Sequence, residues 1–212
     1  MDELWEVVAL SLRVTGSALL ISSGIGVPLG AVVGLTRFPG KRIIIALLYT
    51  GMGLPPVVVG LFVYLLLSRS GPLGSLAWLF TPNAMIAAQT LIALPLIIGL
   101  TVTAVMSVDP ELRRQVNALG ATPAQVAWTV LTEARVGMTA AIVAAFGGII
   151  SEVGAVMLVG GNIAGQTRTL TTAIVLNTRQ GDFGLAMALG IILIGLTFGV
   201  NVLLMKLQGR NF

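Results

Sequence analysis

The sequence predicts an all-α integral membrane protein with about five membrane-spanning helices, which we expect to form a single transmembrane domain over residues 1–212. Three observations support this fold class. Only 9% of the residues are charged, whereas a soluble domain of this size carries about 25%. The mean hydropathy is +1.00. Several uncharged runs reach the roughly 20 residues that an α-helix needs to cross a bilayer.

The composition also excludes several kinds of functional site. The chain has no cysteine and no histidine, which excludes disulfides, Cys/His metal sites and histidine-based catalysis. The net charge of +4 is small and scattered, as is typical of loops that flank membrane spans and not of a nucleic-acid-binding surface. The acidic start, MDELWEVV, argues against a cleaved signal peptide. We therefore expect a lipid bilayer as the surroundings, with no metal and no nucleic-acid partner.

Charged residues and turn signals mark the limits of the expected spans. Apolar sequence before the first span extends back to Val7 around Arg13. The long uncharged stretch before the third span splits at Gly71-Pro72 and Thr81-Pro82, which are dipeptides that favour turns. The five expected spans are Val14–Thr36, Ile43–Ser68, Asn83–Val105, Val136–Val159 and Phe183–Met205.

Prolines and glycines inside these spans predict kinks and close packing. Proline removes a backbone donor and tends to kink a helix; the prolines within spans are Pro28, Pro55, Pro56 and Pro95. The first span could also bend at Gly24 and Gly26. Glycines spaced four apart let two helix backbones approach closely, and they occur as Gly26, Gly30 and Gly34, and again as Gly195 and Gly199. Packing within one subunit is the favoured reading, and a seam between two copies is the alternative.

The distribution of Lys and Arg predicts the orientation, because cytoplasmic loops are enriched in these residues. Five spans place the two termini on opposite sides. One side holds Arg37, Lys41, Arg42, Arg113, Arg114, Arg135, Lys206 and Arg210, whereas the other holds Arg69, Arg168 and Arg179; Arg13, at the edge of the first span, is left out. The first side is therefore expected to be cytoplasmic, with the N-terminus outside and the C-terminus inside.

A polar stretch on the expected cytoplasmic side predicts a helical hairpin, which we call the coupling loop (residues 106–137). Its central sequence is DPELRRQVNALGATPAQVAWTVLTEARVG. Asp109 is a good N-cap before a first-turn proline, and Thr122 is a second one. Gly120 between them can take a left-handed backbone conformation that ends the first helix. Both helices are amphipathic and are expected to be too short to span the membrane.

Two readings of this hairpin are open on local physics. One is an interfacial helix that rests on lipid headgroups, which would favour several Lys or Arg on its polar face. The other is a docking element for a cytoplasmic protein. Docking is favoured because Arg113 and Arg114 are offset by Asp109 and Glu111, and the second helix has almost no charge before Glu133.

The hairpin motif resembles a known family. The order D-P-x-L, seven residues, then G-A-T-P is similar to the loop of ABC importer permeases known by its E-A-A…G motif. In that family the loop sits in a groove of an ATPase subunit. The resemblance implies ATPase-coupling roles for Asp109, Glu111, Arg113, Arg114, Leu119, Gly120, Ala121 and Thr122. Arg114-Gln115-Val116 stands where the family has Glu-Ala-Ala, so an acidic contact becomes a basic one.

Further motifs resemble the permeases of oxyanion importers for molybdate, tungstate and sulfate. These are RFPGK from Arg37, LPPVVVG from Leu54, GPLG from Gly71 and ISEVGAVMLVGGNIAGQTRTLTTAI from Ile150. The last run looks most like the tungstate-type members, since molybdate-type members more often have phenylalanine where Val153 stands. The resemblance implies a type I ABC importer permease fold in the cell membrane. It also implies a homodimer, two ATPase copies and an extracytoplasmic oxyanion-binding protein.

The chain itself is not expected to hydrolyse ATP or to hold a cofactor. The nearest candidate for a phosphate-binding G-x-x-x-x-G-K-[ST] loop is GLTRFPGKR, from Gly34 to Arg42. It has five residues between its glycines instead of four, and Arg42 follows the lysine where a hydroxyl is needed for magnesium. We therefore expect a non-catalytic translocation subunit whose energy comes from a partner.

The expected pathway or gate residues are Glu152, Gly154, Asn162, Thr167 and Arg168. Glu152 is placed inside the fourth span, where a charge costs roughly 3 kcal/mol or more unless it faces protein or water. A structural or gating role is favoured over contact with an anionic substrate. For the polar segment Gly160–Asp182, docking and gating, direct anion contact and a solvated loop all stay open.

Two other function classes compete with the importer subunit. A secondary anion carrier would need coupling-ion chemistry and often shows internal repeats; the sequence has no convincing repeat, and only Glu152 could carry a proton. A membrane scaffold that transports nothing is the third class.

Overall fold

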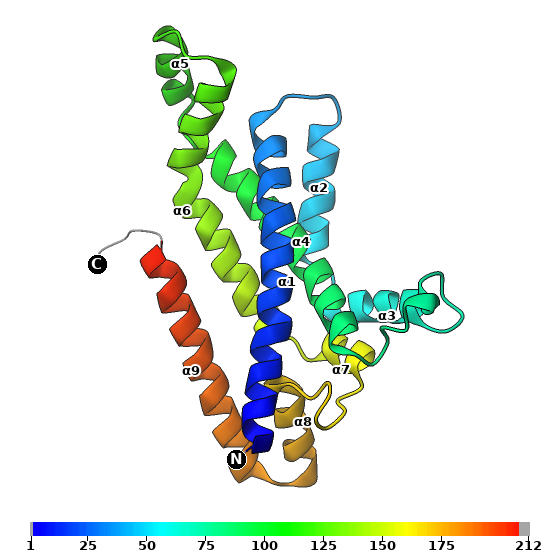
Figure 1. Ribbon diagram of the computed structural model, residues 1–212. Coiled ribbons are helices and arrows are strands. Elements are labelled where there is room, and N and C mark those ends of the chain that lie inside the picture. Colours follow the sequence, from blue (N-terminus) through cyan, green and yellow to red (C-terminus); the bar gives the residue numbers. More distant parts are fainter. Residues whose placement is uncertain (1, 208–212) are drawn as a thin grey trace.

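The uncharged runs fold into long helices in the computed structural model, which describes residues 2–207 (Figure 1). Its described part is all-helical. The elements are α1 (Asp2–Leu35), α2 (Lys41–Met52), α3 (Pro56–Leu67), the 3-10 turn η1 (Gly74–Leu76), α4 (Pro82–Met106), α5 (Pro110–Ala118), α6 (Pro123–Ile150), α7 (Gly154–Gly160), α8 (Leu170–Gln180) and α9 (Phe183–Leu207).

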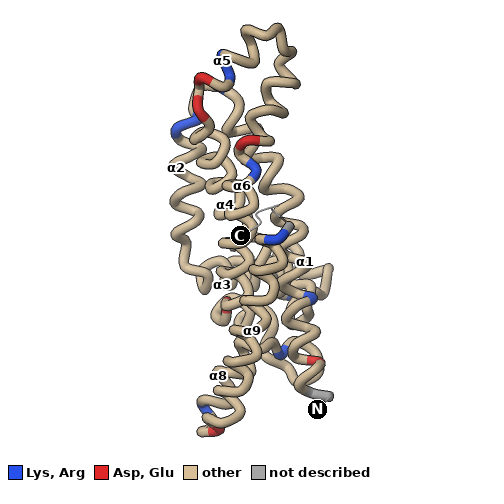
Figure 2. Tube along the Cα trace, turned by 90° about the vertical axis from the view of Figure 1, so that its left-hand side faces the viewer, with Lys and Arg blue, Asp and Glu red and all other residues tan. Residues whose placement is uncertain are grey.

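Four of these helices are long and apolar enough to cross a membrane, and a bent pair makes a fifth candidate. The four are α1, α4, α6 and α9, and the pair is α2 with α3, which meet at an angle of 96°. The expected count of about five spans is confirmed. Charged residues gather towards the end that carries α5 and towards the end that carries α8 and the N-terminus, with few between (Figure 2). Arg210, which the orientation argument counted, lies outside the described residues.

The second span, expected over Ile43–Ser68 with kinks at Pro55 and Pro56, is a sharply bent pair of helices. The chain breaks after Met52, and α3 leaves the bundle sideways (Figure 1). The reason is local: Pro55 and Pro56 have no N–H to bond the preceding turn, and Pro56 instead opens α3, where a missing donor costs nothing. The first span is one unbroken helix, since α1 continues through Pro28.

The fourth span also has different limits from those expected over Val136–Val159. The second arm of the coupling loop is not a separate short helix, because α6 runs without interruption from Pro123 to Ile150. Glu152 therefore lies after the helix, in the break before α7. The break is stabilised by side chains: the Ser151 hydroxyl donates to the carbonyl of Gly147 at 2.9 Å, and the Glu152 carboxylate accepts from the backbone N–H of Ala155 at 2.9 Å.

Glycines on α1 form a close seam with α4. A Cβ added at Gly26 would lie 2.9 Å from Ile97 Cγ2, one at Gly30 would lie 2.6 Å from Thr101 Cβ, and one at Gly34 would lie 2.8 Å from Val105 Cβ. Each step of four along α1 is matched by a step of four along α4, so the two helices run in the same direction. These glycines therefore serve packing within the subunit, as favoured from the sequence. Gly195 and Gly199 on α9 have no atom within 4 Å of an added Cβ.

Candidate functional site

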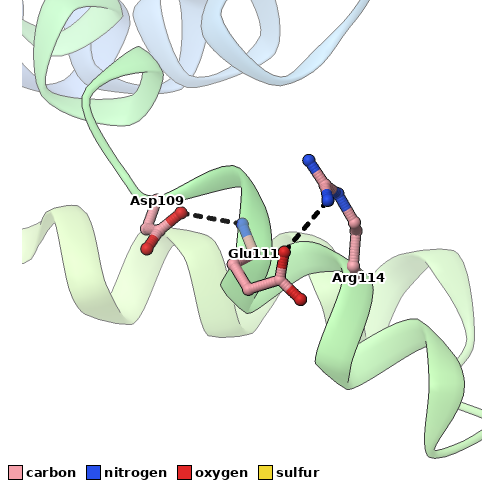
Figure 3. A network of polar contacts seen from close by, with 3 residues as sticks. All are labelled: Asp109, Glu111 and Arg114. Atoms are coloured by element: carbon pink, nitrogen blue, oxygen red, sulfur yellow. Dashed lines mark hydrogen bonds and ion pairs between the residues drawn. The ribbon is translucent and has the colours of Figure 1, made fainter.

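The first helix of the coupling loop begins at a capped aspartate. The Asp109 carboxylate accepts a hydrogen bond from the backbone N–H of Glu111 at 2.8 Å, and Pro110 takes the first helical position (Figure 3). Negative charge at this end of a helix is favourable because the free N–H groups carry partial positive charge. The cap therefore fixes where α5 starts after α4.

The turn between the two arms depends on Gly120. Its φ is +81°, in the left-handed region that residues with a Cβ rarely adopt. The N–H of Gly120 donates to the carbonyl of Asn117 at 2.9 Å. Two residues later α6 starts with a capping box, in which the Thr122 N–H donates to the Gln125 side chain at 2.8 Å and the Gln125 N–H donates to the Thr122 hydroxyl at 3.4 Å. Every feature of this turn holds the two arms at a fixed angle.

The base of the coupling loop is anchored on the membrane helices by an apolar cluster. Its buried members are Ala104, Val105, Val108, Val130 and Ala134. Leu112 on α5 and Leu131 on α6 pack against this cluster. The guanidinium of Arg113 lies 3.5 Å from the Val105 carbonyl oxygen, at the end of α4. The loop is therefore joined to α4 and to the rest of α6 by side-chain packing.

The tip of the loop exposes large apolar side chains. Leu119 is 87% exposed and Trp128 is 73% exposed. Leu112 and Val116 share the apolar stripe expected for α5 and are half-buried, so Leu119 is left on the outer surface. Arg114 pairs with Glu111 at 3.0 Å on the exposed face (Figure 3). Exposed pairs of this kind contribute little free energy, so the apolar tip is the stronger candidate for a contact.

A semi-open cleft of about 400 Å³ lies beneath the hairpin, between α4, α5 and α6. Asp109 and Glu133 line it, together with Ser107 and Gly137. Within residues 2–207 the structure has no group of three or more His, Cys, Asp or Glu side chains that could hold a metal ion. The structure thus places all eight expected coupling residues on one hairpin above this cleft.

The expected gate residues fall into two places. Glu152 lies in the break between α6 and α7, and Gly154 is the first residue of α7; a Cβ added at Gly154 would lie 2.5 Å from Val57 Cγ2 on α3. Thr171 at the start of α8 donates its hydroxyl to the Glu152 carbonyl at 3.1 Å. The two breaks in the membrane, between α2 and α3 and between α6 and α7, are therefore packed against each other.

Asn162, Thr167 and Arg168 lie in the loop between α7 and α8. Thr167 is fully buried; its hydroxyl donates to the Gly160 carbonyl at 2.6 Å and accepts from the Ile163 N–H at 2.9 Å. Asn162 has a left-handed backbone, with φ +51°. Further along, the N–H of Leu170 donates to the buried hydroxyl of Ser11 on α1 at 2.8 Å. Thr167 and Leu170 are therefore packed inside the protein and are not solvated.

Gln89 is a buried polar residue that the sequence reasoning missed. It lies on α4 and is 3% exposed. Its amide Nε2 donates to the carbonyl of Ile149, in the last turn of α6, at 2.8 Å. The last four carbonyls of a helix have no partner within that helix, so Gln89 stabilises the point where α6 ends. The sequence signal that could have identified Gln89 is a side-chain amide within an otherwise apolar span.

Comparison with known proteins agrees with this geometry. Residues 26–210 match the family described as binding-protein-dependent transport system inner membrane component. The chain is 46% identical over 211 residues to a probable anion ABC transporter permease protein of Haloferax volcanii, covering 97% of this chain and 91% of the relative. It is 40% identical over 206 residues to the tungstate uptake system permease protein TupB of Peptoclostridium acidaminophilum, covering 97% and 90%.

More distant matches extend the comparison. The molybdenum transport system permease protein ModB of Escherichia coli K12 is 30% identical over 195 residues, covering 87% of this chain and 85% of the relative. Among solved structures, an inward-facing conformation of the MetNI methionine ABC transporter matches with a TM-score of 0.71 over 98% of this chain and 93% of that chain. At 18% identity, the latter match shows the fold alone, which is the type I importer permease fold expected from the sequence.

Proposed function

The chain belongs to the family of binding-protein-dependent transport system inner membrane components, and from this premise we propose that it is the membrane subunit of an ATP-driven oxyanion importer. Tungstate is the favoured substrate, with molybdate and sulfate as the alternatives. The order follows the relatives: those with 40% and 37% identity are named as tungstate permeases, and those named for molybdenum are 30% identical or less. The 46% identical relative is named only for an anion.

The observation that carries the coupling role is the exposed apolar tip of a rigidly capped hairpin. Leu119 and Trp128 have little to bury against within this chain, and solvent-exposed apolar groups of this size mark contact sites. In the proposed assembly two copies of the chain form a homodimer, and each coupling loop binds one ATPase subunit. Closure of the two ATPases then moves α4 and α6 through the apolar base of the loop and switches the access of an anion pathway.

Replacing Trp128 with alanine is expected to weaken binding of the ATPase. Truncation of a well-packed interface tryptophan costs about 2 kcal/mol or more, which is roughly thirtyfold in Kd. The measurement is retention of the co-expressed ATPase on the tagged permease during purification. Trp5→Ala is the matched control, because Trp5 is 72% exposed at the opposite end of the molecule. Equal retention by the two variants would count against docking through this face.

The gate is proposed to lie where the two helix breaks pack together. The Glu152 carboxylate accepts a hydrogen bond at the start of α7, which supports a role in holding the break over direct contact with an anion. Gly154 permits the close approach of α3, and Thr171 ties α8 to the same break. Asn162, Thr167 and Arg168 would transmit contacts from outside to this point.

The orientation is proposed from the same charge asymmetry. The coupling loop and the turn between α1 and α2 would face the cytoplasm, and the N-terminus and α8 would face outward. An extracytoplasmic oxyanion-binding protein would then dock on the outer loops and deliver the anion. No nucleotide, metal or other cofactor is proposed for this chain.

The substrate is tested with the permease and its ATPase in liposomes, with the binding protein loaded in turn with tungstate, molybdate or sulfate. ATP hydrolysis should be stimulated most by the tungstate-loaded protein, because the liganded binding protein stabilises the conformation in which the ATPases close. Stronger stimulation by the molybdate- or sulfate-loaded protein would show that this anion, and not tungstate, is the substrate. Uptake driven by an ion gradient without the ATPase would instead favour a secondary carrier.

A further inference from the structure

Arg13 is a charged residue on α1 that the proposed import mechanism does not use. Its neighbour Val14 is fully buried and packs in the same cluster as Ala84 and Met85, in the first turn of α4. Arg13 itself is exposed. The chain therefore directs one side of α1 into the bundle and leaves this guanidinium on the outer face of the molecule.

The depth of Arg13 follows from helix geometry. At the other end of α1, the Lys41 ammonium donates to the carbonyls of Gly34 at 3.1 Å and Thr36 at 2.9 Å, which marks a polar boundary near Leu35. Arg13 is about 33 Å from Leu35 at 1.5 Å per residue, and the hydrocarbon core is about 30 Å thick. The neighbouring Val14 packs beside the first turn of α4, so α4 places Arg13 at the same depth. Arg13 is thus expected at the lipid headgroups, on the face opposite the coupling loop.

A cleft of about 390 Å³ opens beside it. The residues that carry polar groups in its lining are Glu6 and Arg13 on α1, and Gln166 and Arg168 in the loop after α7. The rest of the lining is Val7, Ala9 and Leu10 on α1, Pro82 at the start of α4, and Gly165, with φ +69°. Two arginines from separate segments, Arg13 and Arg168, therefore line one cleft, and Arg13 places this cleft at the expected depth of the headgroups.

The chemistry of the lining favours a phosphate group. Guanidinium groups donate paired, charge-assisted hydrogen bonds to phosphate oxygens. Glu6 lies two helical turns further from the hydrocarbon than Arg13. A carboxylate there opposes a free, multiply charged anion more strongly than the singly charged phosphodiester of a phospholipid.

We propose that this cleft is a binding site for the phosphate group of a phospholipid in the leaflet opposite the coupling loop, with Arg13 as its principal contact. The cleft shares Arg168 with the proposed gate, but Arg13 has no part in the proposed import function. It would hold the outer end of α1 against the loop between α7 and α8. The shared chemistry is recognition of a phosphate-type oxyanion, and a free inorganic oxyanion is the competing source.

The test measures thermal unfolding of the full-length chain in detergent micelles. Phosphatidylglycerol is titrated in, and diacylglycerol with the same acyl chains serves as the control that lacks phosphate. The lipid should raise the unfolding temperature of wild type, and Arg13→Gln should require about fivefold more lipid for half of the effect, as expected for one basic residue near a membrane surface. Arg13→Lys should keep most of the effect. Arg179→Gln, at an exposed arginine in the last turn of α8, should match wild type.

Two further titrations separate the sources of the anion. Inorganic phosphate and tungstate, added without lipid, should leave the unfolding temperature of wild type unchanged. Protection by either free anion that is lost in Arg13→Gln would overturn the lipid as ligand. Equal phosphatidylglycerol protection of wild type and Arg13→Gln, or equal protection by diacylglycerol, would overturn the site itself.

Discussion

Gly120→Pro is expected to abolish co-purification of the ATPase with the permease while leaving the membrane helices folded. Proline fixes φ near −65°, whereas Gly120 has φ +81°, so the turn cannot keep its geometry. Proline also removes the N–H that donates to the Asn117 carbonyl, and it restricts Leu119 before it. Because the tip then points elsewhere, the contact surface of Leu119 and Trp128 is lost as a unit.

The control for this experiment is Gly120→Asn. Asparagine adopts left-handed backbone more readily than other residues with a Cβ, so this variant should retain the ATPase with a modest loss at most. Size-exclusion profiles of both variants check that the bundle is intact. If Gly120→Pro retains the ATPase as wild type does, the coupling loop is not the docking element.

Gly30→Val is expected to produce the largest loss of folding stability of any single change considered for α1. A Cβ at this position would lie 2.6 Å from Thr101 Cβ and 2.8 Å from the carbonyl oxygen of Ile98. The carbonyl belongs to the backbone of α4 and cannot rotate away, so the two helices must separate. Overpacking of this kind costs about 1–3 kcal/mol, and sometimes more. The measurement is the midpoint of thermal unfolding in detergent.

Gly24→Val is the matched control on the same helix. Gly24 is exposed, and a Cβ added there meets no atom within 4 Å. Gly24 and Gly30 are less than two helical turns apart, and both variants add the same side chain. The variants therefore differ mainly in the atoms that the new side chain contacts. A fall in the unfolding midpoint that is the same for both would show that glycine is needed for helix flexibility and not for the seam with α4.

Both arms of the coupling loop could be predicted from the sequence because their signals are local. Asp109 and Thr122 cap helices as expected, and Gly120 takes the left-handed conformation that was expected of it. Each depends on a few neighbouring backbone groups. The length of the second arm was wrong, since α6 continues into the membrane as far as Ile150. Nothing between Val130 and Val136 ends a helix, and the charges at Glu133 and Arg135 only mark where it enters the bilayer.

The candidate gate was harder to predict, because its partners are far apart in the sequence. The break after Ile150 is stabilised by Gln89 from α4 and by Thr171 from α8. Its close neighbour across the gap is Val57 on α3, beside the break at Pro55 and Pro56. Hydropathy treats both regions as continuous apolar sequence, so it assigns one span where the chain forms two helices.

The composition alone indicated that this is a membrane protein, because a chain with 9% charged residues has too few charges to cover its surface in water. The lengths of the uncharged runs indicated the number of spans. Motifs in the coupling loop and in the run from Ile150 also indicated the family. The tertiary structure was needed to show where α6 ends and which distant side chains contact the break after it. Inside a bilayer every backbone donor and acceptor must find a partner within the protein, so a break forms where nearby residues or other helices supply one. For α6 the amide of Gln89 is one such partner, since the fold brings it within 2.8 Å of the Ile149 carbonyl, which also accepts the N–H of Glu152.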